Sequence, residues 1–141
     1  MRVVIDTNVW VSRLLLADSV AARAVDSALR NSEVIVSEPL IEELADVLAR
    51  EKFDRYVSLA DREEFLRRIL QVAATFPVLS EVDDCRDADD NRLLALALDS
   101  QSDYILTGDK DLLTMSPWRG ILIISPRAFL DATALRASPE P

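Results

Sequence analysis

The chain alternates from end to end between short apolar runs and longer segments in which apolar residues recur with helical spacing. The short runs are rich in Val, Ile and Leu, a composition typical of buried strands. Pro77 makes the third run an edge strand, because proline cannot donate a ladder hydrogen bond. This strand–helix–strand alternation predicts a three-layer α/β/α fold, in which right-handed crossovers build a parallel sheet. The predicted strands cover residues 3–5, 33–37, 76–79, 104–107 and 121–124.

The helical segments carry apolar residues three and four positions apart and often begin near Ser, Asp or Pro. Arg62, Arg67 and Arg68 in one of them are expected to form a solvated face. The chain has 141 residues, half of them hydrophobic, which is enough for one core. Because no repeat or linker is visible, we predict a single domain over residues 1–133 and a frayed tail over 134–141. The predicted helices cover residues 9–16, 19–31, 39–53, 61–76 and 93–98, and a last one starts at 126.

The sequence contains no histidine but 25 acidic residues. The lack of histidine excludes Ser-His-Asp and Cys-His nucleophilic schemes and the usual zinc and copper ligand sets. Any bound metal is therefore expected to be a hard cation held by oxygen. Gly108 and Gly120 are the only glycines, so neither a glycine-rich dinucleotide motif nor a P-loop is present.

The single cysteine, Cys85, excludes an intramolecular disulfide framework and fits a reducing compartment. No apolar run reaches the ~18–20 residues that cross a bilayer, and Asp6 interrupts the N-terminal run too early for a signal peptide. We expect a cytoplasmic protein without membrane association. The net charge of −9 argues only weakly against a nucleic-acid partner, because carboxylates that bind cations make a nuclease site negative.

Two predicted strands end in an aspartate. Asp6 follows residues 3–5, and Asp109 follows residues 104–107 after Gly108. Because the carboxyl ends of parallel strands share one edge, where open α/β sheets bind ligands, these carboxylates are expected to lie there together. On its own, Asp6 is equally well explained as a cap of the helix that follows it.

Helical phase selects two further carboxylates. At roughly 100° per residue, Glu43 lies beside the apolar face of its helix, whereas Glu42 and Asp46 fall on the solvent side. In the acidic segment DADDN, Asp90 falls on the inward side of the following helix and Asp89 at its margin. Like charges at ~4 Å repel by several kcal/mol at an intermediate dielectric, so such a cluster points to a cation such as Mg²⁺.

Three motifs resemble the PIN domain, specifically the ribonuclease toxins of bacterial and archaeal toxin–antitoxin pairs. They are VVIDTNVWVS, SEPLIEELADVLAREKF and DADDNRLLALALDSQSDYILTGDKDLL, and together they span nearly the whole chain in the family's order. The resemblance implies a five-stranded parallel sheet in the order 3-2-1-4-5. It also implies endonuclease action on RNA, one or two Mg²⁺ or Mn²⁺ ions, and an antitoxin and a homodimer as partners.

By motif, the resemblance implies metal ligation and catalysis by four acidic residues, with Asn8, Thr107 and Asp87 in support. Asp87 is the second choice after Asp90, and the sequence leaves open which of Asp87, Asp89 and Asp90 is the ligand. The positive charges nearest the motifs are weak candidates for phosphate contact, namely Arg13, Arg50, Lys52 and Lys110. The four implied catalytic residues are Asp6, Glu43, Asp90 and Asp109.

Two functions compete with that of a ribonuclease. One is a magnesium-dependent phosphatase of the haloacid-dehalogenase kind, whose DxDxT motif is replaced here by DTN at residues 6–8, without the second aspartate. The other is a catalytically silent PIN-like module that binds RNA or an antitoxin. A binding module has no reason to retain so costly a cluster of carboxylates, which favours the enzyme.

Overall fold

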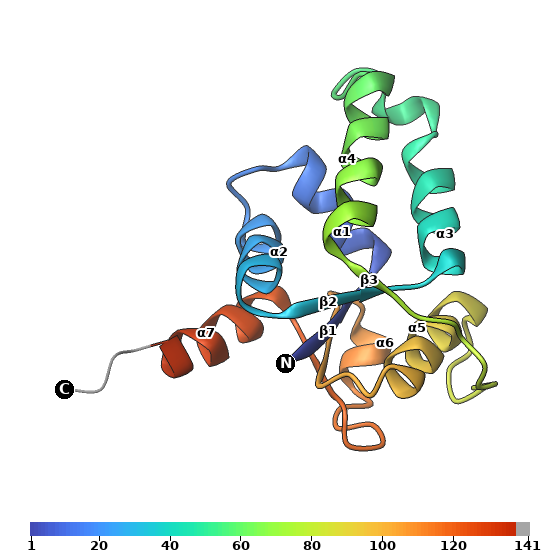
Figure 1. Ribbon diagram of the computed structural model, residues 1–141, viewed down its shortest axis with the longest axis vertical. Helices are drawn as coiled ribbons and strands as arrows, with labels where there is room; N and C mark the ends of the chain where they lie inside the picture. Colours follow the sequence, from blue (N-terminus) through green and yellow to red (C-terminus); the bar gives the residue numbers. More distant parts are fainter. Residues whose placement is uncertain (138–141) are drawn as a thin grey trace.

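The fold is built on an all-parallel sheet, which the computed structural model shows within residues 1–137, the part of the chain that it describes. The strands lie in the order β3-β2-β1-β4-β5 (Figure 1). Val4, in the central strand, pairs with Ile35 on one side and Ile105 on the other. The predicted sheet and its order are confirmed. The strands are β1 (Arg2–Ile5), β2 (Glu33–Val36), β3 (Ala74–Thr75), β4 (Tyr104–Leu106) and β5 (Leu122–Ile124).

Helices cover both faces of the sheet. The helices α1 to α4 lie on one face, with α3 and α4 rising side by side from it, and α5 and α6 lie on the other (Figure 1). The last helix, α7, packs against α2. A short 3₁₀ turn, η1 (Glu51–Phe53), follows α3. The helices are α1 (Thr7–Leu15), α2 (Val20–Asn31), α3 (Glu38–Leu48), α4 (Leu59–Val72), α5 (Ala88–Asp99), α6 (Lys110–Leu113) and α7 (Pro126–Ala137).

The core lies on both sides of β1. Val3, Val4 and Ile5 are fully buried, which explains why this strand is a continuous apolar run rather than an alternating one. On the face of the sheet covered by α1 to α4, the Trp10 ring meets the Phe65 ring edge to face, with 6.2 Å between the ring centroids. No helix in the described residues is both long and apolar enough to span a bilayer.

The predicted position of the third strand is wrong. We expected residues 76–79, but β3 covers Ala74–Thr75 and lies at the sheet edge. The Phe76 N–H still donates to the Val36 carbonyl at 2.9 Å. Pro77, the next residue, has no N–H, so the ladder stops there. The chain then leaves the sheet, and the N–H groups of Leu79 and Ser80 donate to the Asp99 carboxylate.

The prediction that Arg62 lies on a solvated face is also wrong. Its side chain is buried, and it donates to the carbonyl of Leu48 at 2.8 Å and to that of Val57 at 2.9 Å. It also pairs with Asp54 at 2.7 Å. Leu48 is the last residue of α3, where helical carbonyls lack intrahelical partners, so this arginine joins α3 to α4. Arg67 and Arg68 are exposed as predicted and pair with Glu64.

The first part of the predicted tail belongs to α7. Helix α7 continues through Ala137, because Ala and Leu are strong helix formers, so residues 134–137 are helical rather than frayed. Residues 138–141 lie outside the described residues. Helix α6 (Lys110–Leu113) is absent from the predicted helices.

Candidate functional site

Asp6 stands where β1 ends and α1 begins. Its N–H donates to the Leu106 carbonyl at 2.9 Å, which extends the pairing of β1 with β4. Although Asp6 occupies the cap position of α1, its carboxylate makes no capping hydrogen bond. Oδ2 instead accepts a hydrogen bond from the Thr107 hydroxyl at 2.7 Å. The capping alternative therefore does not account for the Asp6 side chain.

Thr107 connects the two strand ends. Its buried hydroxyl donates to Asp6 and accepts from the Asp109 N–H at 3.0 Å. The side chain of Asp109 is exposed, and its Oδ1 accepts from the Asp111 N–H at 2.8 Å, capping α6. The expected support from Thr107 is thus visible as a hydrogen-bond chain from β1 to the turn after β4.

The acidic loop presents its three aspartates differently. Asp87 is exposed and caps α5 by accepting from the Asp89 N–H at 2.8 Å. Asp89 is exposed and pairs with Arg92 at 3.3 Å. Asp90 is half-buried and turns toward the strand ends, where burial and the charges of Asp109, Asp87 and Asp6 raise its pKa to about 6. Of the three, Asp90 is the one whose pKa is raised by the charges of both strand-end aspartates, Asp6 and Asp109.

Glu43 approaches from α3 on the opposite face of the sheet. It is half-buried, and burial together with the charges of Asp89 and Asp6 raises its pKa. The Thr7 hydroxyl lies close enough to lower that pKa, yet it is buried without a partner in hydrogen-bonding geometry among the described residues. Glu42 and Asp46 are exposed, as predicted.

Burial also raises the pKa of Asp6, opposed by the Thr107 hydrogen bond and by the nearby N–H groups of Thr7 and Asn8. The charge of Asp109 acts in the same direction as burial. The carboxylates at this edge thus disfavour one another's ionisation. A cation would reverse this effect, because opposite charge favours the ionised form.

Two open hollows, each of about 320 Å³, are lined by candidate carboxylates. Asp87, Asp90, Asp109 and Asp111 line one of them. The other lies between α3 and α5, where its lining includes Glu43, Asp89, Arg50 and Arg92.

The donor set suits a hard cation in its chemistry, since every candidate ligand is a carboxylate oxygen. Within residues 1–134, no three acidic or cysteine side chains converge closely enough to enclose an ion together. Mg²⁺ is commonly bound by one or two carboxylates and several waters, so this spacing is compatible with a partly hydrated ion. Asp90 and Asp109 line the same hollow, and the charges of Asp109 and Asp6 both act on Asp90.

Two predicted cations are not brought to this site, and one predicted supporting residue stays untested. Asn8 lies two residues after Asp6, and its side chain is exposed and forms no hydrogen bond with the rest of the described chain. Arg13 pairs with Asp26 at 2.7 Å between α1 and α2, and Lys52 lies over the Phe53 ring. Lys110 is exposed directly after Asp109, so it and Arg50 are the predicted cations that remain near the carboxylates.

Three residues at the site were not predicted. Asn91 holds the acidic loop in place, because its side-chain oxygen accepts from the Cys85 N–H and its amide donates to the Cys85 carbonyl, both at 2.8 Å. Arg92 neutralises Asp89 beside Glu43. Thr7 reaches Glu43 from α1. The spacing of Arg92 from Asp89, three residues on one helix, is a signal that the sequence already contains.

Comparison with known proteins gives concordant results. A family model described as the PIN domain matches residues 2–111, a range that includes all four candidate carboxylates. The chain is 28% identical over 123 residues to the uncharacterized protein MJ1680 of Methanocaldococcus jannaschii. The aligned region covers 82% of this chain and 75% of that protein.

Two solved structures share the fold. One is VapBC2 from Rickettsia felis bound to a DNA fragment from their promoter, with a TM-score of 0.63, 11% identity, and coverage of 89% of this chain and 98% of that one. The other is PAE2754 from Pyrobaculum aerophilum, with a TM-score of 0.63, 16% identity, and coverage of 96% of this chain and 90% of that one. At these identities the likeness establishes the fold.

Proposed function

Because this chain belongs to the PIN domain family, we propose that it is a metal-dependent endoribonuclease and the toxin component of a toxin–antitoxin pair. The observation that carries the proposal is the link from Asp6 through the Thr107 hydroxyl to Asp109, with Asp90 coupled electrostatically to both aspartates. Residues 101 positions apart in the sequence are thereby joined at one edge of the sheet.

Asp6, Asp90 and Asp109 are proposed to hold one or two Mg²⁺ or Mn²⁺ ions, directly or through water, and Glu43 to ligate an ion or orient the attacking water. When bound, such an ion polarises the phosphoryl oxygens and makes water a better nucleophile at neutral pH. Thr107 fixes the rotamer of Asp6. Glu43, whose pKa is raised, is suited to accept a proton from the attacking water.

The decisive test is Asp6→Asn, which keeps the size of the side chain and removes its charge. We expect RNA cleavage in Mg²⁺ to fall by more than about 100-fold, beyond the usual cost of removing a residue that only orients a ligand. Glu63→Gln, at an exposed position of α4, is the control and should cleave at the wild-type rate. Wild-type cleavage by purified, folded Asp6→Asn would refute the assignment.

The silent-module alternative is separated by titrating Mn²⁺ into the protein with a fluorescent RNA. A pure binder retains the RNA and yields no products, whereas the proposed enzyme yields products in proportion to the bound metal. The phosphatase alternative predicts hydrolysis of a small aryl phosphate and no RNA products.

An antitoxin partner is proposed for the groove between α1, α2 and α4. The groove has a volume of about 380 Å³, and Trp10, Leu14, Phe65 and Val72 contribute to its apolar lining. The Trp10 indole N–H is buried there without a partner among the described residues. Val72 and the nearby helix end at Leu16 are 63% and 60% exposed. The VapBC2 likeness favours an antitoxin as the occupant, with a second copy of this chain as the rival.

A further inference from the structure

Two arginines on α2 border the same groove and have no partner within the described residues, a property that they share with Arg50, Arg55 and Arg127. In a chain with a net charge of −9, most arginines are paired with carboxylates, but Arg23 and Arg30 form no ion pair or hydrogen bond within the described residues. Both side chains are exposed. An arginine without a carboxylate partner offers its whole guanidinium fork to an anion. The paired ones are Arg2, Arg13, Arg62, Arg67, Arg68, Arg86, Arg92 and Arg119.

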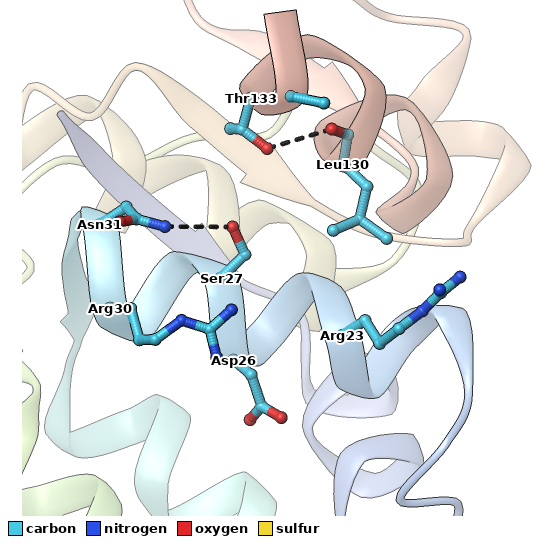
Figure 2. A pocket seen from close by; sticks show the side chains of 8 residues that line it. Arg23, Asp26, Ser27, Arg30, Asn31, Leu130 and Thr133 are labelled. Carbon is cyan, nitrogen blue, oxygen red and sulfur yellow. Dashed lines mark hydrogen bonds between the residues drawn. The ribbon is translucent and has the colours of Figure 1, made fainter. Parts of the chain in front are cut away.

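These two arginines line one groove, of about 330 Å³, between α2 and α7 (Figure 2). Figure 2 shows Leu130 of α7 pointing toward α2, with Thr133 beside it. Asp26 also borders the groove, but its side chain points away from α7, and Arg13 neutralises it at 2.7 Å. The groove is therefore positively charged although the whole chain is acidic.

The spacing of the arginines suits a chain of anions rather than a single one. Arg30 lies seven positions after Arg23, which is about 10.5 Å along the helix axis and nearly two full turns. One phosphate cannot contact both guanidinium groups across such a span when they extend outward, whereas successive phosphates of a nucleotide strand can. Guanidinium groups recognise phosphate oxygens in a bidentate manner.

The neutral lining favours RNA over other polyanions. The Thr133 hydroxyl donates to the Phe129 carbonyl at 2.8 Å, which leaves its oxygen lone pairs available as acceptors. The Ser27 oxygen accepts only a long hydrogen bond, 3.5 Å, from the Asn31 amide. Acceptors beside a phosphate track can receive the ribose 2′-OH, the group by which proteins distinguish RNA from DNA.

The groove is separate from the carboxylates. Helix α2 ends at Asn31, directly before the start of β2, and α7 leaves the carboxyl end of β5 at Pro126. Both helices therefore run from the carboxyl edge of the sheet toward its amino edge, where no candidate carboxylate lies. A strand held in this groove would extend away from the site of cleavage.

We infer that the α2–α7 groove binds the phosphodiester backbone of single-stranded RNA through Arg23 and Arg30, and so anchors substrates that reach beyond the carboxylate site. This inference rests on the proposed ribonuclease function. Its consequence is a preference for long RNA over short RNA that does not depend on the chemistry of cleavage.

The binding test uses the full chain carrying Asp6→Asn, so that RNA is not consumed. We compare this protein with its Arg23→Ala/Arg30→Ala derivative by fluorescence anisotropy, using a labelled single-stranded RNA of about 20 nucleotides over a range of KCl. We expect affinity to fall by about tenfold or more. The slope of log K against log salt should fall by about 1.4, since each lost phosphate contact accounts for about 0.7.

Arg67→Ala/Arg68→Ala is the control for charge alone, because it removes two exposed arginines from α4; both affinity and slope should then change little. Unchanged affinity and slope in the Arg23→Ala/Arg30→Ala protein would overturn the inference. Displacement of the RNA by polyglutamate as effectively as by unlabelled RNA would also overturn it, in favour of an acidic protein as ligand.

A second arm uses the cleaving protein. The loss of kcat/KM caused by Arg23→Ala/Arg30→Ala should be about tenfold greater for the long RNA than for a tetranucleotide. Equal losses would reject an anchoring role. If no RNA is cleaved at all, the ribonuclease proposal fails, but the anisotropy experiment still decides whether the groove binds RNA.

Discussion

The hydroxyl of Thr107 is the smallest group on which the geometry of the carboxylate site depends. It donates to Asp6 and accepts from the N–H of Asp109, so that one oxygen atom relates two strand ends. It also lowers the pKa of Asp6 against the effect of burial. Its removal should therefore change both the position and the charge of Asp6.

We predict that Thr107→Val, which keeps the shape and removes the hydroxyl, lowers RNA cleavage by about 10–100-fold. Stability should fall by roughly 1–3 kcal/mol, because a buried polar group loses its partner. Paired measurements of kcat/KM and urea unfolding check this. Thr75→Val, at an exposed position of β3, should alter neither quantity. Full activity of Thr107→Val would show that Asp6 needs no such orientation.

The raised pKa of Asp90 leads to a pH prediction. The pKa is about 6 in the folded chain and near 3.8 when the chain is unfolded, so between these values the folded state binds more protons. Without metal, stability therefore falls as pH rises from about 4 to about 6 because of this group. Asp90→Asn should raise the melting temperature at about pH 8 in a chelator, and the gain should shrink toward about pH 4.

Asp99→Asn is a control for which the pH dependence of stability should have the opposite sign. Slight burial acts to raise the pKa of Asp99, but hydrogen bonds from Ser80 and Leu79 lower it overall, so the charged form is stabilised. That stability is present above about pH 4 and is lost as pH falls.

Added Mn²⁺ at neutral pH should stabilise the wild type and have less effect on Asp90→Asn. A pH-independent effect of Asp90→Asn would contradict the assignment.

At the scale of residues, strand ends and helical phase, which are local properties, selected Asp6, Glu43, Asp90 and Asp109, and the structure brings these carboxylates to one edge of the sheet. Their roles as ligands and catalysts stay predictions, as does the support expected from Asn8, whose side chain is exposed. Thr7 was missed because its burial beside Glu43 depends on how α1 packs against α3, which no local pattern encodes.

At the scale of elements, the connection of α3 to α4 depends on one buried side chain. Arg62 supplies hydrogen bonds to the carbonyls of Leu48 and Val57, which have few other partners at the ends of their segments. We predict that Arg62→Met costs roughly 2–3 kcal/mol of stability, because the buried carbonyl of Leu48 and the half-buried carbonyl of Val57 lose their donor. Urea unfolding measures this.

Arg67→Met tests whether any arginine of α4 has the same effect. Its side chain is 62% exposed and pairs only with Glu64, so its replacement should change stability by less than about 0.5 kcal/mol. Equal losses for Arg62→Met and Arg67→Met would mean that the buried hydrogen bonds contribute nothing specific.

The elements also show where local patterns fail. Helical periodicity located α2 and the starts of α3 and α4, but it extended the third predicted helix to residue 53 and the fourth to residue 76, whereas α3 ends at Leu48 and α4 at Val72. It also placed Arg62 among the solvent charges, because it cannot anticipate a loop that folds over a helix start. The apolar residues 76–79 resembled a strand, but the ladder ends at Pro77. In both cases the outcome was decided by hydrogen-bond partners distant in sequence.

At the scale of the whole molecule, the strand order creates the site. β1 lies between β2 and β4, and the helices after β1 and β4 go to opposite faces, which leaves a crevice at the carboxyl edge between these strands. Asp6 and Asp109 flank that crevice, while α3 and α5 bring Glu43 and Asp90 from either side. The alternation of strands and helices predicted a parallel sheet, whereas the strand order was predicted only by the resemblance to the PIN domain.

The groove between α1, α2 and α4 gives a prediction about assembly. Val72→Asp places a charge on its apolar lining at an exposed position, so it should leave the fold intact and abolish co-purification with the cognate antitoxin. Leu79→Asp, on an exposed loop, is the control. Retained binding would exclude this groove. Loss of self-association alone, seen by size-exclusion chromatography, would assign it to a second copy of this chain.

The position of these surfaces along the chain has a consequence for synthesis. The side chains lining the groove between α1, α2 and α4 lie between residues 10 and 72, whereas the bond from Thr107 to Asp6 needs the last third of the chain. On the ribosome, the surface proposed to meet the inhibitor is translated well before the residues that complete the cutting edge. Under the proposed function, a growing chain therefore cannot cleave RNA until Thr107 and Asp109 have been made.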